Sequence, residues 1–327
     1  MGRMEFRKIN RLMKTVSIIL NLLFLGSFIF AQNPDSSKYL QISKEAISTI
    51  KLDGYPDFLT VDGNDVWVTN IGKVQKLSIK SKIPILSVDI PDPCGASVIG
   101  KGSLWLASCK DRSIYRIDHK TGKIIAIVPI NISDPDGEIS LAFGAGSLWI
   151  LTDSSGVLTR IDPKTNTIEA NIKVNPHSYC AAYGFKSIWI TTSTDPGFVQ
   201  RIDPKTNSII NTIPVGPIPR FLSAGENGIW TLNQKDGTIS HIDPSSNKMI
   251  ATIYADVPGS GGDIAVGDKK VWVRAKKSTF LLTIDPNSNE VLNRYLPLCG
   301  SGAVRVSNNH IWVSAHDVNS IWIINKR

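Results

Sequence analysis

Metal-binding and thiol side chains are scarce in this sequence, which has only four cysteines and five histidines among 327 residues. No two cysteines have CxxC spacing, so a zinc or redox motif is not supported. The chain also lacks HExxH, GxSxG and P-loop sequences. No catalytic class is therefore indicated by a motif.

Long apolar runs are nearly absent, and the one that exists lies near the N-terminus. Residues 16–30 are apolar with small polar interruptions, follow a basic head and precede Ala31. This layout is typical of a secretory signal peptide, and the run is shorter than the roughly 20 residues of a spanning helix. We expect cleavage near Ala31 and a secreted or periplasmic protein; an uncleaved anchor is the alternative. Residues 32–42 are polar and predict a spacer, and no other segment could span a membrane.

Basic runs are also missing, although the net charge is +8. Residues 1–31 hold five basic residues and one acid, which leaves 31 of 36 basic and 27 of 28 acidic residues, or +4, in the remainder. Only the pairs 269–270 and 276–277 place two lysines together. A nucleic-acid binder would concentrate basic residues on one face, so a nucleic-acid partner is not expected.

What the sequence does contain is a repeat of roughly forty residues. Seven tryptophans share one context, with a β-branched residue or Leu before and an apolar residue or Thr after, and successive gaps of 38, 44, 40, 41, 42 and 40 residues. They are Trp67, Trp105, Trp149, Trp189, Trp230, Trp272 and Trp312. An eighth, Trp322, lies outside this register. Fixed periods in this range indicate a repeat architecture.

Each unit contains four short strands separated by turn sequences, with no helical period. A GKGS- or GAGS-type turn precedes the Trp strand, and the next strand ends in Ile-Asp followed by a turn such as the DPKTN of 162–166. Asp, Pro and Asn each favour one position of that turn. Such units cannot bury both faces alone, and radial repetition solves the problem. The sequence predicts an all-β, seven-bladed propeller over residues 43–327, with the tryptophans packed between blades.

The two ends of the chain predict how the ring closes. The last unit stops in its third strand, after residues 320–327, and lacks a fourth. Residues 43–52 match the fourth strand of other units. We therefore expect the N-terminal strand to complete the last blade and to remove two open sheet edges.

Two of the four cysteines are expected to meet. In the second unit, the turn at Lys101-Gly102 pairs residue 100 with 103, so that cross-strand partners sum to 203, as Cys94 and Cys109 do. Facing residues are close enough for a disulfide, which an exported chain allows. Two buried free thiols are the alternative. Cys180 and Cys299 lie three units apart and are expected to be unpaired.

One face of the ring is the candidate functional surface. Loops that enter the first strand and leave the Trp strand of each blade lie on the same face, around the central channel. The ligand-binding candidates at these positions are Tyr55, Asp57, Asp136, Glu138, His177, Tyr179, Arg220, Phe221, Asp263, Arg274 and His316, with Asp317 beside the last. Acids, bases and aromatics together suit a small-molecule or peptide site. The uniform DPKTN-type turns on the opposite face are interpreted as structural.

A metal site is one alternative use of this face. Asp57, Asp136, Glu138 and Asp263 all fall near the expected channel mouth. Gathered carboxylates hold Ca²⁺ or Mg²⁺. No cofactor is predicted, and Mg²⁺ or Ca²⁺ remains open.

The repeats VWVTN at 66–70, GSLW and RIDPKTN resemble those of YVTN-type propellers and, more distantly, of streptogramin (virginiamycin B) lyases. The resemblance covers about residues 43–327. The resemblance to YVTN-type propellers implies an extracytoplasmic binding or surface protein. One branch of that family is linked to DNA binding, which the weak excess of basic residues here does not favour. Such propellers host many functions, so the resemblance informs the fold more than the activity.

The lyase side of the resemblance implies an Mg²⁺-assisted C–O eliminase that opens a cyclic depsipeptide. It also implies a His from a Pro-His entry loop and a Glu three residues after a blade Trp. Pro176-His177 matches the first element. The second is absent, because the residues at that spacing are Asn70, Ser108, Thr152, Thr192, Asn233, Ala275 and Ala315. Lyase chemistry is therefore not transferred to this chain.

The sequence thus predicts a monomeric exported propeller that binds a small molecule, peptide or protein on its channel face without catalysis. The alternative is a metal-assisted enzyme of the streptogramin-lyase or lactonase type. A structural module of the cell surface is a third possibility, and it would need a large exposed apolar patch.

Overall fold

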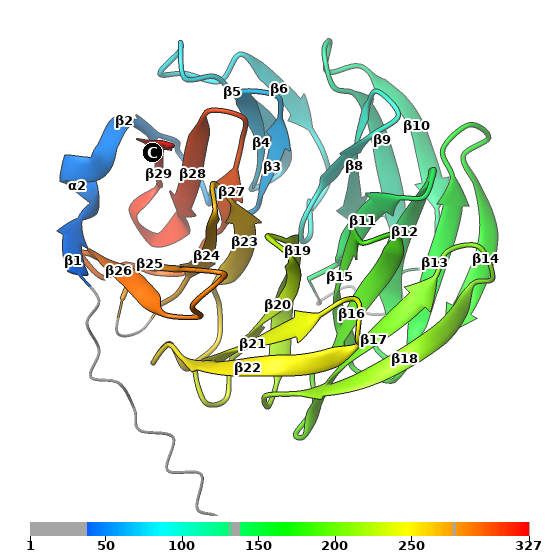
Figure 1. The fold of residues 1–327 in the computed structure, drawn as a ribbon. Helices are drawn as coiled ribbons and strands as arrows, with labels where there is room; N and C mark the ends of the chain where they lie inside the picture. The colour runs from blue at the N-terminus through cyan, green and yellow to red at the C-terminus, as the bar shows by residue number, and fades with distance from the viewer. Residues whose placement is uncertain (1–37, 131, 133–137, 277–278, 327) are drawn as a thin grey trace, which may run out of the picture. The chain divides into compact units, whose positions relative to one another are not determined.

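The computed structural model describes residues 38–130, 132, 138–276 and 279–326. It contains seven sheets, each with a core of four antiparallel strands; five of them are built from consecutive strands, and the other two include an N-terminal strand, β1 or β2. The innermost strands contact one another in succession, and the last of them, β27 (Val304–Val306), contacts the first, β3 (Leu59–Asp62). Seven blades therefore form a closed ring, as the Trp repeat predicts (Figure 1).

The blades are numbered in chain order from the inner strand outward. Blade 1 is β3, β4 (Asp65–Asn70), β5 (Lys73–Leu77) and β6 (Leu86–Asp89). Blade 2 is β7 (Val98–Gly100), β8 (Ser103–Ser108), β9 (Ser113–Asp118) and β10 (Ile124–Pro129). Blade 3 is β11 (Leu141–Gly144), β12 (Ser147–Asp153), β13 (Val157–Asp162) and β14 (Thr167–Lys173). Blade 4 is β15 (Ser178–Gly184), β16 (Ser187–Thr192), β17 (Gly197–Asp203) and β18 (Ser208–Val215).

Blade 5 is β19 (Pro219–Gly225), β20 (Gly228–Asn233), β21 (Thr238–Asp243) and β22 (Lys248–Tyr254). Blade 6 is β23 (Asp263–Gly267), β24 (Lys270–Arg274), β25 (Leu281–Ile284) and β26 (Val291–Leu296), with β1 (Lys38–Gln41) added outside. Blade 7 is β27, β28 (His310–Ala315), β29 (Ser320–Asn325) and β2 (Ala46–Lys51). The short helices are α2 (Ile42–Glu45) and the 3₁₀ turn η1 (His316–Val318).

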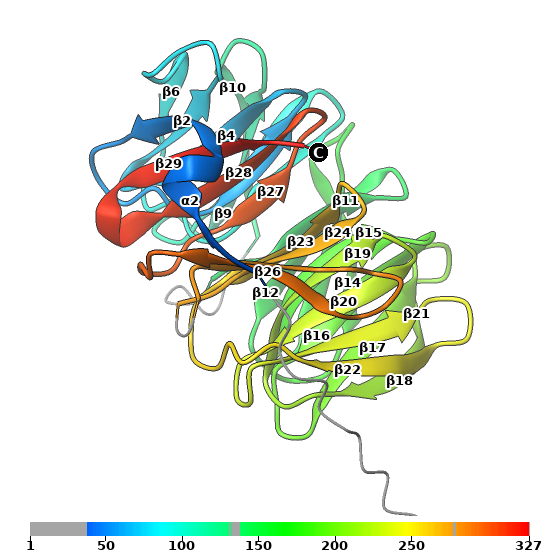
Figure 2. The ribbon, with the colours of Figure 1, turned by 60° about the vertical axis from the view of Figure 1, so that its left-hand side comes forward.

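The N-terminal strand closes the ring as predicted. Strand β2 pairs antiparallel with β29, and Thr49 lies opposite Trp322. Residues 32–42, expected as a spacer, include β1, which pairs in parallel with β26 on blade 6. Ile42 then buries its side chain, at 1% exposure, in a core cluster with Tyr295 of blade 6 and Ile324 of blade 7. The segment therefore joins blades 6 and 7, as Figure 2 shows for β1, α2 and β2. Among the described residues, no helix is long and apolar enough to cross a membrane.

The seven repeat tryptophans are buried, six of them at 0% exposure. In five blades the indole N–H donates to the carbonyl of the glycine five residues earlier, as Trp149 does to Gly144 at 3.0 Å. In blades 1 to 5 a Lys, Arg or His side chain of the next strand packs over the indole ring. Tryptophan therefore serves the inter-blade core and is not available to a ligand.

An arginine of the RID sequence links each of three blades to the next. In blade 4 the Arg201 guanidinium lies 4.8 Å from the centre of the Trp189 ring. It donates to Pro244 O at 2.8 Å and to Asn247 Oδ1 at 2.7 Å, both in the turn of blade 5. Arg160 and Arg116 make the same contacts one and two blades earlier, respectively. The DPKTN turns are thus structural, and their Asn accepts a bond from the preceding blade.

The cysteines of blade 2 form a disulfide between Cys94 and Cys109, with Cα atoms 5.7 Å apart. Strands β7 and β8 have the expected register, with Val98 opposite Trp105. Further along, Pro93 pairs with Ser108, so the register has shifted by two where the bond forms. Cys180 and Cys299 are free.

Candidate functional site

The candidate residues lie where blades begin and where Trp strands end. Glu138 precedes β11, Tyr179 lies on β15, and Arg220 and Phe221 lie on β19. Asp57 precedes β3. Because each blade presents its entry loop on the same face, residues far apart in sequence converge there. Asp136 lies outside the described residues.

Three cavities open among these residues. The central channel has a volume of about 430 Å³ and is lined by the inner strands of all blades. A second cavity of about 390 Å³, the His177 cavity, is lined by His177, Tyr179 and Arg220. A third of about 600 Å³, the Asp57 cavity, is lined by Asp57 with Tyr55. Glu138 lines all three, so its exposed carboxylate lies where they meet.

Tyr179 organises the centre of this face. Its hydroxyl donates a hydrogen bond to the Glu138 carboxylate. The guanidinium carbon of Arg220 lies 3.7 Å from the centre of its ring, and Phe221 packs edge-on with ring centres 5.8 Å apart. Burial and the negative charge of Glu138 raise the pKa of the Tyr179 hydroxyl. Tyr179 is therefore a protonated donor to Glu138 at neutral pH.

Arg220 has its charge exposed to the His177 cavity. Among the described residues its guanidinium has no hydrogen-bond acceptor; stacking on Tyr179 alone orients it. A guanidinium offers five donors in a fixed plane, which suits a carboxylate or phosphate. The arrangement leaves those donors available to a ligand anion.

His177 sits on a strained loop at the same cavity. Its φ of 61° is left-handed, a conformation that non-glycine residues seldom adopt. Backbone bonds fix the loop, from His177 N to Ser154 O at 2.8 Å and from Ser193 N to His177 O at 2.9 Å. The hydroxyl of Ser193 is buried against the cavity and has no partner among the described residues. Such groups mark a place where a ligand could complete the hydrogen bonding.

Asp57 is held by its backbone while its carboxylate is unbonded. Its N–H donates to Thr69 O at 3.0 Å, and its carbonyl accepts from Ser314 Oγ at 2.6 Å. The carboxylate has no hydrogen-bond donor among the described residues. Burial raises its pKa to about 7, with Glu138 and Asp263 adding to the effect and Arg274 opposing it. A cation would be favoured beside it.

Tyr55 lines the Asp57 cavity, and His316 packs against its ring. Their rings stack with centres 4.0 Å apart, and Tyr55 Oη lies 3.0 Å from His316 Nε2. Burial lowers the pKa of His316, so the imidazole is neutral at pH 7. This pair adds aromatic surface next to the Asp57 carboxylate.

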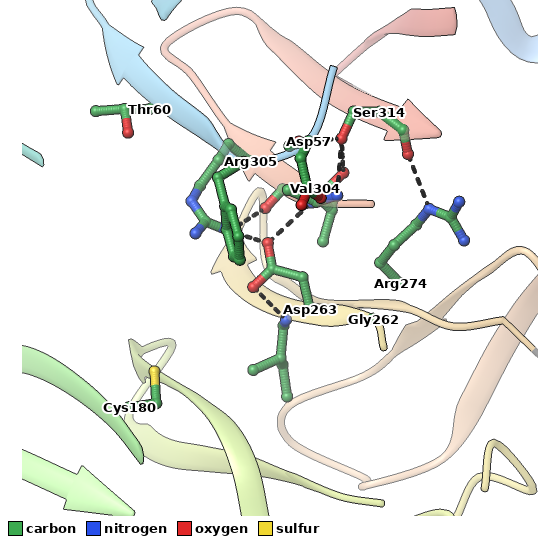
Figure 3. A network of polar contacts seen from close by, with 12 residues as sticks. Asp57, Thr60, Cys180, Gly262, Asp263, Arg274, Val304, Arg305 and Ser314 are labelled. Atoms are coloured by element: carbon green, nitrogen blue, oxygen red, sulfur yellow. Dashed lines mark hydrogen bonds and ion pairs between the residues drawn. The ribbon is translucent and has the colours of Figure 1, made fainter. Parts of the chain in front are cut away.

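The Asp263 carboxylate is bound by other groups of the protein. It forms a buried ion pair with Arg305 of blade 7, and accepts from Val304 N at 3.0 Å and Ile264 N at 2.9 Å (Figure 3). Burial raises its pKa, although Arg305 opposes that shift. Arg305 also lines the channel and was not among the sequence candidates. The only sequence signal for Arg305 is its position on the inner strand of the blade next to that of Asp263.

Arg274 is fully buried, and its guanidinium is hydrogen-bonded to backbone carbonyls of the protein. Its guanidinium donates to Ser314 O at 3.0 Å and to Phe280 O at 2.8 Å, and also to the carbonyls of Ala275 and Gly300. Phe221 is likewise buried, at 7% exposure. Arg274 is therefore not open to a ligand, whereas Phe221 packs under Tyr179 and borders the central channel.

The carboxylates of this face that the structure describes do not gather into a metal site. Within the described residues, no group of three or more His, Cys, Asp or Glu side chains is placed to hold an ion. At the spacing where the lyase resemblance requires a Glu, blade 3 has Thr152, which lines the His177 cavity. The donor set that the structure brings together therefore does not fit the Mg²⁺ site implied by the resemblance.

Comparison with known proteins identifies the fold. No protein-family model and no curated protein matches the sequence. A streptogramin B lyase structure aligns with a TM-score of 0.73 at 15% identity, covering 86% of this chain and 97% of the other. Virginiamycin B lyase from Staphylococcus aureus gives 0.70 at 15%, covering 85% and 98%. BamB from Moraxella catarrhalis gives 0.61 at 11%, covering 86% and 97%. At these identities the likeness concerns the propeller fold alone.

Proposed function

We propose that this protein is an exported propeller that binds a small molecule, peptide or protein on the face formed by Glu138, Tyr179, Arg220 and Asp57, without catalysing a reaction. The main observation in support of this proposal is that Glu138 borders three cavities at once. Cavities of 390–600 Å³ are in the size range of ligand sites. Unpaired charges on their walls supply the polar contacts that orient a ligand.

Export is supported by the N-terminal sequence and by the cysteines. Residues 1–31 have the three-part layout of a signal peptide. The Cys94–Cys109 disulfide is compatible with an oxidising compartment such as the periplasm or the medium. N-terminal sequencing of the secreted protein tests this part: a chain beginning near Gln32 is expected, and an intact Met1 would contradict it.

A thermal-shift screen tests the binding function. A ligand that binds only the folded state raises the melting temperature by mass action. We expect at least one small molecule or peptide to raise it in the wild type and not in Glu138→Gln. Asp89→Asn changes an exposed acid of β6 and is the matched control. If no compound distinguishes Glu138→Gln from the control, the face is not the binding site.

A metal-assisted enzyme of the lyase or lactonase type is the second candidate. One observation favours it: His177 and Glu138, a base and an acid, line one cavity. Elemental analysis of the purified protein and thermal shifts with Mg²⁺ and Ca²⁺ separate the two candidates. Stoichiometric metal that is lost in Glu138→Gln would favour the enzyme. No shift with either ion favours the non-catalytic function.

A further inference from the structure

The binding face has two poles of opposite charge. On one side the Asp57 cavity presents the Asp57 carboxylate, unbonded among the described residues, with Glu138 at its border. On the other side the His177 cavity presents Arg220, whose donors lack an acceptor there, beside the Ser193 hydroxyl. Glu138 belongs to both cavities, so a ligand passing it would meet both poles.

Tyr179 keeps the poles from neutralising each other. Its hydroxyl binds Glu138 while its ring face holds Arg220, so the acid and the base contact opposite parts of one side chain. No ion pair joins Glu138 to Arg220 among the described residues. In a partly buried site, unpaired charges are costly. A ligand that brings one charge of each sign would relieve both costs.

The separation of the poles sets the ligand's length. Glu138 and Arg220 are one tyrosine side chain apart, and Asp57 lies beyond Glu138 in the next cavity. An extended chain spans at most about 3.3–3.6 Å per residue. Two or three residues therefore suit a ligand whose ammonium reaches Asp57, beyond Glu138, while its carboxylate binds Arg220. Phe58, Pro91 and Pro93 line the Asp57 cavity and favour an apolar first side chain.

Resting on the proposed binding function, we infer that the ligand is a zwitterion, a short peptide with both termini free. Its ammonium group binds between Asp57 and Glu138, and its carboxylate binds the guanidinium of Arg220. Ser193 completes the carboxylate's hydrogen bonding. The Tyr55 ring, which His316 holds by stacking, covers the N-terminal residue.

Binding should also release protons near neutral pH. Burial and the charges of Glu138 and Asp263 raise the pKa of Asp57 to about 7, and Arg274 opposes them. Tyr55, with His316 stacked on it, also interacts with Asp57, and Asp92 and Lys110 line the same cavity. A bound ammonium stabilises the ionised carboxylate and lowers that pKa. At pH 6.5 the complex therefore holds fewer protons on Asp57 than the unliganded protein.

Isothermal titration calorimetry with the purified protein tests the inference. The probes are pooled dipeptides and tripeptides with apolar side chains in four forms: free, N-acetylated, C-amidated and blocked at both ends. Single amino acids form a fifth arm. We expect free peptides to bind and either block to raise the Kd at least tenfold. In two buffers of different ionisation enthalpy at pH 6.5, free peptides should release protons and lose that release in Asp57→Asn.

Variants assign each pole. Arg220→Gln should bind free and C-amidated peptides equally, and Asp57→Asn should do the same for free and N-acetylated peptides. Lys205→Gln, on the opposite face, and Asp89→Asn are the matched controls.

Lys110 is the exposed cation at the Asp57 cavity. If Lys110→Gln loses the preference for a free carboxylate and Arg220→Gln keeps it, the assignment to Arg220 is wrong. Should Arg220→Gln fail to fold, Arg220→Lys, which keeps the charge but not the planar fork, is expected to weaken binding only of peptides that have a free carboxylate.

The outcomes separate this inference from the proposed function. Doubly blocked peptides that bind as tightly as free ones would overturn the zwitterion but leave a binding face. Single amino acids that bind more tightly than any peptide would overturn the peptide length. Absence of any peptide binding overturns the inference, and the small-molecule screen then decides the proposed function on its own.

Discussion

The guanidinium carbon of Arg220 lies 3.7 Å from the centre of the Tyr179 ring. The two residues belong to neighbouring blades, on β19 and β15. Stacking of this kind is worth about 0.5–2 kcal/mol and fixes the guanidinium without using its hydrogen-bond donors. The relationship explains how a cation can be held rigidly at a cavity wall and still be available to a ligand.

Replacing Tyr179 should impair binding without removing either charge. In Tyr179→Leu the spacer is gone, so Glu138 and Arg220 can approach and pair. We expect ligand affinity to fall at least tenfold, while Tyr179→Phe, which keeps the ring, should stay within about threefold of the wild type. Calorimetry gives the affinities, and circular dichroism checks that both variants are folded. Equal loss in the two variants would show that the hydroxyl, and not the spacing, is what matters.

Asp57 should lower stability at neutral pH. Its pKa in the folded protein is raised from 3.8 to about 7. The folded state therefore binds the proton more tightly, and the associated stability is fully present below about pH 4 and lost as pH rises to 7. Asp57→Asn removes this cost. We expect it to increase the free energy of unfolding at pH 8 by roughly 1–3 kcal/mol, below the roughly 4 kcal/mol of the full shift.

Urea denaturation at pH 4 and pH 8 measures the effect. The gain from Asp57→Asn should disappear at pH 4, where the wild-type carboxyl is protonated. Asp89→Asn, at an exposed position, should show no gain at either pH. A gain of the same size at both pH values would mean that the carboxylate's charge is not the cause. A residue that costs stability and is needed for binding is expected at functional sites.

The arginine links between blades should contribute measurably to stability. Arg201 stacks on Trp189 and donates to Pro244 O and Asn247 Oδ1 of the next blade. Hydrogen bonds to charged groups are worth about 1.5–3 kcal/mol. We expect Arg201→Ala to lower the free energy of unfolding by about 2–4 kcal/mol, given the added loss of packing. Lys205→Ala, in the adjacent exposed turn, should change it by less than about 0.5 kcal/mol.

Blade 5 replaces the arginine by a histidine and should confer pH dependence. His241 stacks on Trp230 with ring centres 3.6 Å apart, and its Nδ1 lies 2.8 Å from Asn289 Oδ1. Burial lowers its pKa, opposed by Asn289. The neutral ring is therefore favoured in the folded state. This stability is present above pH 6.5 and is lost as pH falls below it.

A double substitution can rebuild the link in blade 5. Where other blades have a serine that accepts from the arginine Nε, blade 5 has Gly228, and a Cβ there would lie 2.4 Å from His241 Nε2. Gly228→Ser alone should destabilise. Gly228→Ser with His241→Arg should recover stability and lose the pH dependence between 5 and 7. Thermal denaturation of the four proteins gives the coupling energy, and additive effects would argue against this explanation.

Much of the fold could be read from the sequence because it is encoded locally. Tryptophan spacing, two-residue turns and the Asp-Pro-Lys-Thr-Asn turns act within one blade, so the repeat alone indicates seven blades. The missing fourth strand at the C-terminus indicated closure by residues 43–52, and β2 confirms it. The added strand β1 left no such signal, because its four residues KYLQ are mostly exposed and pair through the backbone.

Which candidate residues form the site could not be read from local sequence in the same way. Sequence position placed Arg220 and Arg274, or Asp57 and Asp263, on equal terms. Tertiary structure decided between them through partners from other blades: Ser314 and Gly300 satisfy Arg274, and Arg305 neutralises Asp263. Arg220 and Asp57 meet no such partners among the described residues. A side chain's freedom to bind depends on what the neighbouring blade places beside it, tens of residues or more away, whereas the number of blades follows from the turns and strands that each repeat carries within itself.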